Sequence, residues 1–145
     1  MSEFKTPLIT EEINGIYARL FKPLVYESSL LSRTITVPTN FVCDYESIPL
    51  FKSTSKRAGV IHDYLCRNDL PFKITKQKAA SVYLEAMACR DKKFGKGWFK
   101  KAWLLFYRNM KVLVVRVAPG YFQKLPVDAS FDEVKNNKLK SGRKK

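Results

Sequence analysis

The first 45 residues have the spacing of short β-strands. Ile16, Ala18 and Leu20 alternate with Tyr17, Arg19 and Phe21 after the turn signal Asn14-Gly15, and the β-branched run 34–37 ends at Pro38. The connections between these segments are too short for crossover helices. We therefore expect a small N-terminal antiparallel sheet.

Further along the chain the apolar spacing becomes helical. Ile61, Tyr64 and Leu65 share one face, which predicts a helix over about residues 56–67. Thr75 is a suitable N-cap for a second helix. Five residues would form the apolar stripe of that helix: Ala79, Val82, Tyr83, Ala86 and Met87.

A third stretch, from about residue 96 to Met110, is apolar over more than half of its helical circumference, which predicts a core helix. Residues 134–145 hold one leucine and no aromatic residue after Val134, which predicts a flexible basic tail. The predicted fold is α+β, with the small sheet packed by two or three helices. We expect one globular domain over residues 1–133 and the tail over 134–145.

Composition supports a folded domain, and the sequence shows which segments carry the excess positive charge. The chain has 145 residues, 46% of them hydrophobic, and its 10 Phe, 7 Tyr and 2 Trp exclude disorder of the whole chain. Lys and Arg number 27 against 13 Asp and Glu. Residues 92–116 hold eight basic residues and no acid, and residues 134–145 hold six more and again no acid. These fourteen equal the net charge of +14, so an anionic partner would meet the C-terminal half.

The best candidates for nucleic-acid or anion contact lie in these two segments: Lys96, Lys100, Lys101, Arg108, Lys111, Arg143, Lys144 and Lys145. The first segment also interleaves basic with aromatic residues, which suits a nucleic-acid groove or a membrane surface. A core helix whose lysines extend outward explains the same pattern, and we favour it.

The cysteines and the lengths of the apolar runs indicate in which cellular compartment the protein is expected. The three cysteines form no CxxC pair, and the N-terminus has no basic region followed by an apolar one, so we expect a reduced, unsecreted protein. The longest apolar run, 102–107, is far too short to span a bilayer. We expect no transmembrane segment.

Most catalytic motifs are absent from the sequence. It contains no GxSxG, Walker loop, GxGxxG or HExxH, and its single histidine, His62, excludes a multi-histidine metal site within one chain. The remaining candidates for chemistry are Asp44, Glu46 and Ser47 in CDYESIP, and His62 with Asp63 in VIHDYL.

Three runs carry a resemblance to a known family: TVPTNFVCDYESIP, AGVIHDYLC and AASVYLEAM. Over about residues 4–110 the chain resembles the family of tailed bacteriophages and prophages catalogued as domain of unknown function 1353. The resemblance implies a bacteriophage origin. It also implies that the family's polar positions fall on Asp44, Ser47, His62 and Asp63.

Two positions depart from the family pattern. Asn40 stands where the family usually has glycine, which is harmless because asparagine tolerates a left-handed backbone. Ala80 stands where the family usually has aspartate. If the family's acids form a metal site or a catalytic dyad, this chain lacks one member.

The polar residues allow two main interpretations. In the first, which we favour, they are a structural clamp: Asp63 pairs with Arg67, His62 bonds Asp44, and Ser47 stabilises its loop. In the second, Asp44, His62 and Asp63 hold a divalent metal or activate a water, with Cys66 as an extra ligand. His62 could also face solvent or an interface. Ser47 is a weak candidate nucleophile with His62 as its base, and Glu46 fits a solvated loop acid.

The favoured function is a small, basic, non-enzymatic virion-associated or assembly protein of a bacteriophage, located in the virion or the host cytoplasm. Its partners would be other virion proteins or nucleic acid, and it would need no cofactor. The first alternative is a metal-dependent hydrolase of cell wall or nucleic acid that uses Asp44, His62 and Asp63. The second is a host-takeover protein that binds a host factor.

Overall fold

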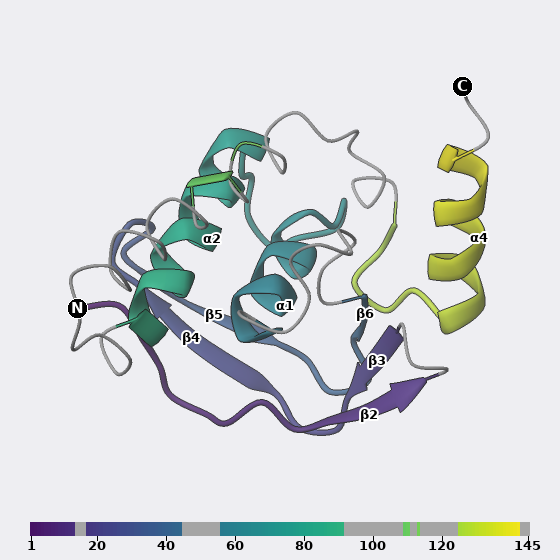
Figure 1. Cartoon of the computed structure of the whole chain (residues 1–145), viewed down its shortest axis with the longest axis horizontal. Coiled ribbons are helices and arrows are strands. Elements are labelled where there is room, and N and C mark those ends of the chain that lie inside the picture. Colours follow the sequence, from purple (N-terminus) through teal and green to yellow (C-terminus); the bar gives the residue numbers. More distant parts are fainter. Residues whose placement is uncertain (14–16, 45–55, 92–108, 111–112, 114–124, 143–145) are drawn as a thin grey trace.

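The computed structural model describes residues 1–13, 17–44, 56–91, 109–110, 113 and 125–142. Within this part of the chain, antiparallel sheets of short strands pack against helices, which confirms the predicted α+β class. The strands form one layer, and helices α1 and α2 cover one face of it (Figure 1). Helix α4 stands at the opposite end of the molecule from the N-terminus (Figure 1).

The first sheet has the order β1-β4-β5, with both pairings antiparallel. It consists of β1 (Glu3–Phe4), β4 (Leu24–Ser28) and β5 (Arg33–Val37). Alternate residues of β4 are buried, among them Leu24 and Tyr26. This is the period of two expected of a sheet with one face against a core.

The second sheet has the order β2-β3-β6 and is also antiparallel. It consists of β2 (Thr10–Ile13), β3 (Tyr17–Leu20) and β6 (Val42–Cys43). Asn40, just before β6, has a φ of 67°, so the left-handed backbone expected at this position is confirmed. The turn aims the chain so that β6 pairs with β3 and the next residue, Asp44, enters the interior.

Two helices cover the first sheet and pack on each other. Helix α1 (Lys56–Leu65) buries most of its residues, and α2 (Lys76–Asp91) buries all five residues of the predicted stripe. The Lys78 amide donates to Thr75 Oγ1 at 3.2 Å, which confirms Thr75 as the N-cap. Both predicted helices are therefore present, with α1 ending two residues before the predicted end.

Helix α4 (Phe131–Gly142) crosses the boundary that the sequence suggested at residue 134. The Ser130 amide and hydroxyl both donate to Glu133 Oε2, at 2.7 and 2.8 Å, and the Glu133 amide donates back to Ser130 Oγ at 3.4 Å. This is a capping box, which fixes where the helix begins. Val134 is fully buried against β3 and β6 residues, so the start of the basic segment is helical and packed.

Several predictions lie outside the described residues. They include most of the third helical stretch, of which the helical Met110 is 37% exposed, and the loop residues Glu46 and Ser47. All eight basic contact candidates also lie outside: Lys96, Lys100, Lys101, Arg108, Lys111, Arg143, Lys144 and Lys145. Within the part of the chain that is described, no helix has the length and apolarity needed to span a bilayer.

Candidate functional site

The structure brings three of the sequence candidates together at the junction of α1 and β6. Asp44 directly follows β6, and His62 and Asp63 lie in the last turns of α1. Asp44 is 4% exposed and Asp63 is 6% exposed, so two carboxyl groups are buried at one junction. Buried carboxyl groups need compensating charge or hydrogen bonds.

Arg67, which follows α1, supplies positive charge to this junction. It is as buried as Asp44, and its Nη2 donates a 2.7 Å hydrogen bond to the carbonyl oxygen of Val42. Its guanidinium also lies 4.8 Å from the centre of the Phe41 ring, which in turn meets Tyr64 edge-on. The helix end is therefore joined to the strand that carries Asp44.

Burial and the neighbouring charges of the junction act together on the pKa of Asp63. Its pKa is raised to about 6, first by burial and then by the negative charge of Asp44. His62 and Arg67 act in the opposite direction. Burial lowers the pKa of Arg67, with Asp63 as the strongest opposing charge. We call Asp44, His62, Asp63 and Arg67 the ionic cluster.

His62 lies between two partners on its own helix. Its Nδ1 is 3.8 Å from Asp63 Oδ1, and its Nε2 is 3.5 Å from Cys66 Sγ. Burial alone would lower the pKa of His62, but Cys66 and Asp63 outweigh it and raise the pKa above its ordinary value. The ring also packs on Tyr83 of α2, with centroids 5.3 Å apart.

These contacts differ in detail from the clamp that the sequence suggested. The ring nitrogens of His62 face Cys66 and Asp63, whereas the clamp had them bonding Asp44. Arg67 acts on Asp63 through its charge, while Nη2 is bonded to the backbone of β6. A link between helix and strand thus exists, and Arg67 forms it.

The metal interpretation receives no geometric support from the described residues. Among them, no group of three or more His, Cys, Asp or Glu side chains is arranged to hold an ion. Ala80, where a further acid would stand in the family, is fully buried in the main core. What the junction can do chemically is compensate buried charge and place an imidazole beside a thiol.

Glu85 is an organising residue that the sequence did not single out. Its carboxylate accepts hydrogen bonds from Ser2 Oγ at 2.6 Å and from Ser28 Oγ at 2.6 Å. It also accepts from Tyr26 OH at 3.0 Å and from the Leu30 amide at 2.8 Å. Burial by itself raises the pKa of Glu85, but these hydrogen bonds outweigh it and lower the pKa.

The contacts of Glu85 explain one of the three sequence runs. Glu85 belongs to AASVYLEAM and joins α2 to the hairpin between β4 and β5, so this run carries a structural residue. The run's EAM segment signalled a polar residue in a helix, but nothing in it signalled partners 55 to 83 positions away.

Comparison with known proteins gives a family but no function. No curated protein and no solved structure matches the chain. A family described as "Protein of unknown function (DUF1353)" matches residues 18–104, which include the ionic cluster, Cys66 and Glu85. This match spans more than half of the 145 residues, so the chain belongs to the DUF1353 family.

Proposed function

We propose that the protein is a non-enzymatic virion-associated or assembly protein of a bacteriophage, which contacts nucleic acid through its basic C-terminal half. The distribution of charge carries the proposal. Residues 92–116 and 134–145 hold fourteen basic residues and no acid, while the rest of the chain is balanced. Binding of a polyanion to such segments releases condensed counterions, which favours the complex.

The packing of α4 supports this proposal. Val134 is buried in an apolar cluster that also contains Tyr17, and the ring of Phe131 meets Tyr17 edge-on at 5.4 Å. The neighbouring residue Lys135 is exposed. The first turn of α4 is thus fixed to the sheet, so a partner would meet a positioned segment and less conformational entropy would be lost on binding.

The order of charges along α4 is also favourable. Asp132 and Glu133 lie in the first turn, and Lys135, Lys138 and Lys140 follow toward the C-terminal end. Acidic residues at the N-terminus of a helix and basic residues at its C-terminus both interact well with the helix dipole. The order of these charges along the sequence therefore favours a helix over these residues.

The hydrolase alternative has less support. Its three candidate residues, Asp44, His62 and Asp63, do meet at one junction, but both carboxyl groups are at most 6% exposed. A hydrolytic acid or metal ligand has to reach substrate or solvent. The bond from Arg67 to the backbone of β6 fits a bracing role for the ionic cluster.

The test compares the affinity of the full chain for a short duplex DNA with that of two charge variants. The test variant replaces three basic residues at the C-terminus with glutamine: Arg143, Lys144 and Lys145. The control variant replaces three exposed lysines outside the basic segments with glutamine: Lys22, Lys73 and Lys78. The two variants have equal net charge, so only the position of the removed charges differs.

The proposal expects the test variant to lose about tenfold or more in affinity and the control variant to lose much less. An equal loss in both variants would mean that total charge matters and the C-terminal end does not. Absence of binding by the unmodified chain at roughly 50 mM salt would end the nucleic-acid proposal.

The assignment to phage particles needs a separate measurement. Mass spectrometry of purified particles should find the protein at a fixed copy number if it is virion-associated. Detection during assembly but not in mature particles would restrict it to an assembly role. Detection in infected cells without any association with particles or their precursors would contradict the assignment.

A further inference from the structure

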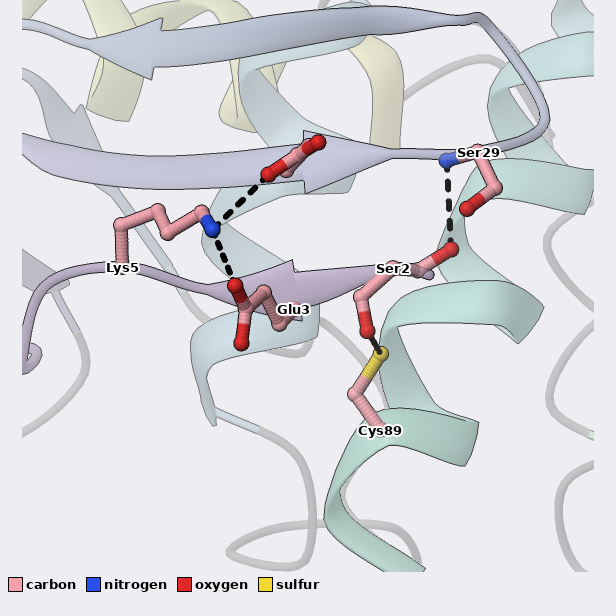
Figure 2. Close-up of polar contacts among 6 residues, drawn as sticks. Ser2, Glu3, Lys5, Ser29 and Cys89 are labelled. Atoms are coloured by element: carbon pink, nitrogen blue, oxygen red, sulfur yellow. Dashed lines mark hydrogen bonds and ion pairs between the residues drawn. The ribbon is translucent and has the colours of Figure 1, made fainter.

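The sulfur atoms of the three cysteines have different neighbours. Cys43 is fully buried and its Sγ donates to the Ala18 carbonyl oxygen at 3.6 Å. Cys89 is half-buried and its Sγ donates to the Ser2 carbonyl oxygen at 3.1 Å (Figure 2). Cys66 is also half-buried, but its Sγ lies 3.5 Å from His62 Nε2. A carbonyl acceptor keeps the proton on sulfur, whereas an imidazole can remove it.

The contacts of His62 favour a ring orientation in which Nε2 faces Cys66. Asp63 Oδ1 lies 3.8 Å from Nδ1, and the Tyr83 ring packs on the imidazole. Since one ring nitrogen faces a carboxyl group, the other is directed to the sulfur of Cys66. A nucleophile, a base and a group that orients the base therefore follow one another, as in activated-nucleophile sites.

A second observation comes from Asp63. This residue is more than nine-tenths buried, and its Oδ2 has no hydrogen-bond partner among the described residues. A buried carboxyl group that is incompletely satisfied gains from positive charge beside it. An imidazolium formed by proton transfer from Cys66 would supply that charge.

We propose that Cys66 is a nucleophilic thiol that undergoes exchange with small, low-molecular-weight disulfides. In the reactive pair the shared proton lies on His62 Nε2, and the thiolate sulfur of Cys66 attacks one sulfur of the disulfide. A new S–S bond forms between Cys66 and that sulfur, the original S–S bond breaks, and the departing thiolate takes up the proton from His62. Cys66 is thereby oxidised and half of the small disulfide is reduced, with no other reactant.

The backbone of Cys66 favours disulfide exchange over acyl transfer. The Cys66 amide already donates to the carbonyl oxygens of His62 and Asp63, at 3.1 and 3.3 Å. It is therefore occupied and does not offer a donor to the oxyanion that an acyl transfer would form. Thiol–disulfide exchange forms no such oxyanion. The inference does not rest on nucleic-acid binding.

The test treats the reduced full chain at neutral pH with hydroxyethyl disulfide, a small uncharged probe, and follows each cysteine by peptide mass spectrometry. Cys89 is the internal control, a half-buried thiol whose Sγ donates to a backbone carbonyl and lies 3.9 Å from Tyr26 OH, and Cys43 reports whether the fold stays closed. Cys66 should react about tenfold faster than Cys89, and Cys43 should react slowest. A rate at Cys66 equal to or below that at Cys89 would overturn the proposal.

The variant His62→Gln tests the role of the imidazole. With Cys43 still protected, the rate at Cys66 should fall to that of Cys89. An unchanged rate at Cys66 would show that the imidazole does not activate the thiol and would overturn the proposal. If Cys43 becomes reactive in this variant, the fold has opened, and two other measurements decide. The unmodified chain must show a high ratio of the Cys66 rate to the Cys89 rate, and Cys66 must react more slowly in the Asp63→Asn variant. Failure of either result would overturn the proposal.

Discussion

The guanidinium of Arg67 donates a 2.7 Å hydrogen bond to the carbonyl oxygen of Val42 and so joins the end of α1 to β6. Arg67 is 4% exposed, and its positive charge acts to lower the pKa of the buried Asp63. The same side chain therefore satisfies a backbone carbonyl and compensates buried negative charge. This dual role makes Arg67 the residue on which the stability of the junction should depend most.

Replacing Arg67 with alanine should lower the free energy of unfolding by about 3 to 5 kcal/mol, because Asp44 and Asp63 would lose the charge that compensates them. Urea unfolding measures the loss. Lys73→Ala, at an exposed position, serves as the control and should change stability by less than about 0.5 kcal/mol. A loss below about 1 kcal/mol in Arg67→Ala would show that the ionic cluster is not braced by this residue.

The stability of the protein should fall as the pH rises through the neutral range. The pKa of Asp63 is raised from 3.8 to about 6, so the folded state binds this proton more tightly than the unfolded chain. The pKa of His62 is raised above 6.5, so its stabilisation is complete below 6.5 and is lost as the pH rises through its folded pKa. The protonated forms of both groups therefore stabilise the folded state, and this stabilisation is greater below neutral pH than above it.

Between about pH 5 and pH 7 the Asp63→Asn variant should lose less stability than the unmodified chain, by on the order of 1 kcal/mol. Urea unfolding at several pH values measures the difference. Asp128→Asn, at an exposed position, should keep the unmodified pH profile. A parallel profile in Asp63→Asn would contradict the raised pKa of Asp63.

Substituting glutamine for Glu85 should cost about 1 to 3 kcal/mol, because the amide retains one acceptor oxygen for donors that include the fixed Leu30 amide. Thermal unfolding gives the cost, and hydrogen exchange at the Leu30 amide locates it. Glu11→Gln, at an exposed position of β2, should leave both measurements unchanged. Unaltered exchange at Leu30 in Glu85→Gln would mean that Glu85 does not hold the hairpin.

The elements that the sequence predicts well are those defined by local spacing. The stripe of α2 depends on residues three and four positions apart, and the backbone at Asn40 depends on one residue type, so both could be predicted. The grouping of Asp44 with His62 and Asp63 also followed from the sequence, through the family resemblance. These features need no knowledge of distant contacts.

The features that the sequence did not predict depend on long-range contacts or on an overlooked local signal. Glu85 gathers donors from β4 and the N-terminus, and Arg67 reaches a carbonyl 25 positions away, which no local pattern reveals. Helix α4 did have a local signal, the pair Ser130 and Glu133 at capping-box spacing. The high charge of residues 134–145 favoured the prediction of a flexible tail, although Val134 is buried in the apolar cluster that contains Tyr17.

The packing of α4 determines how the binding proposal is best tested. Cutting the chain after Val134 would remove six basic residues but would also remove most of a helix in which Val134 is buried. Loss of binding by such a truncation would not separate charge from structure. Substitutions at 143–145, beyond the end of α4, leave the helix sequence intact.

The most direct measurement of the central claim is the dissociation constant for duplex DNA as a function of salt, from about 50 to 200 mM. For the unmodified chain the logarithm of affinity should fall steeply with the logarithm of salt, by about 0.9 for each phosphate that the protein neutralises. With Arg143, Lys144 and Lys145 replaced by glutamine, the slope should decrease by about 0.9 for each phosphate that is no longer neutralised. A slope near zero, or the same slope in this variant and the unmodified chain, would contradict nucleic-acid contact by the basic C-terminal end.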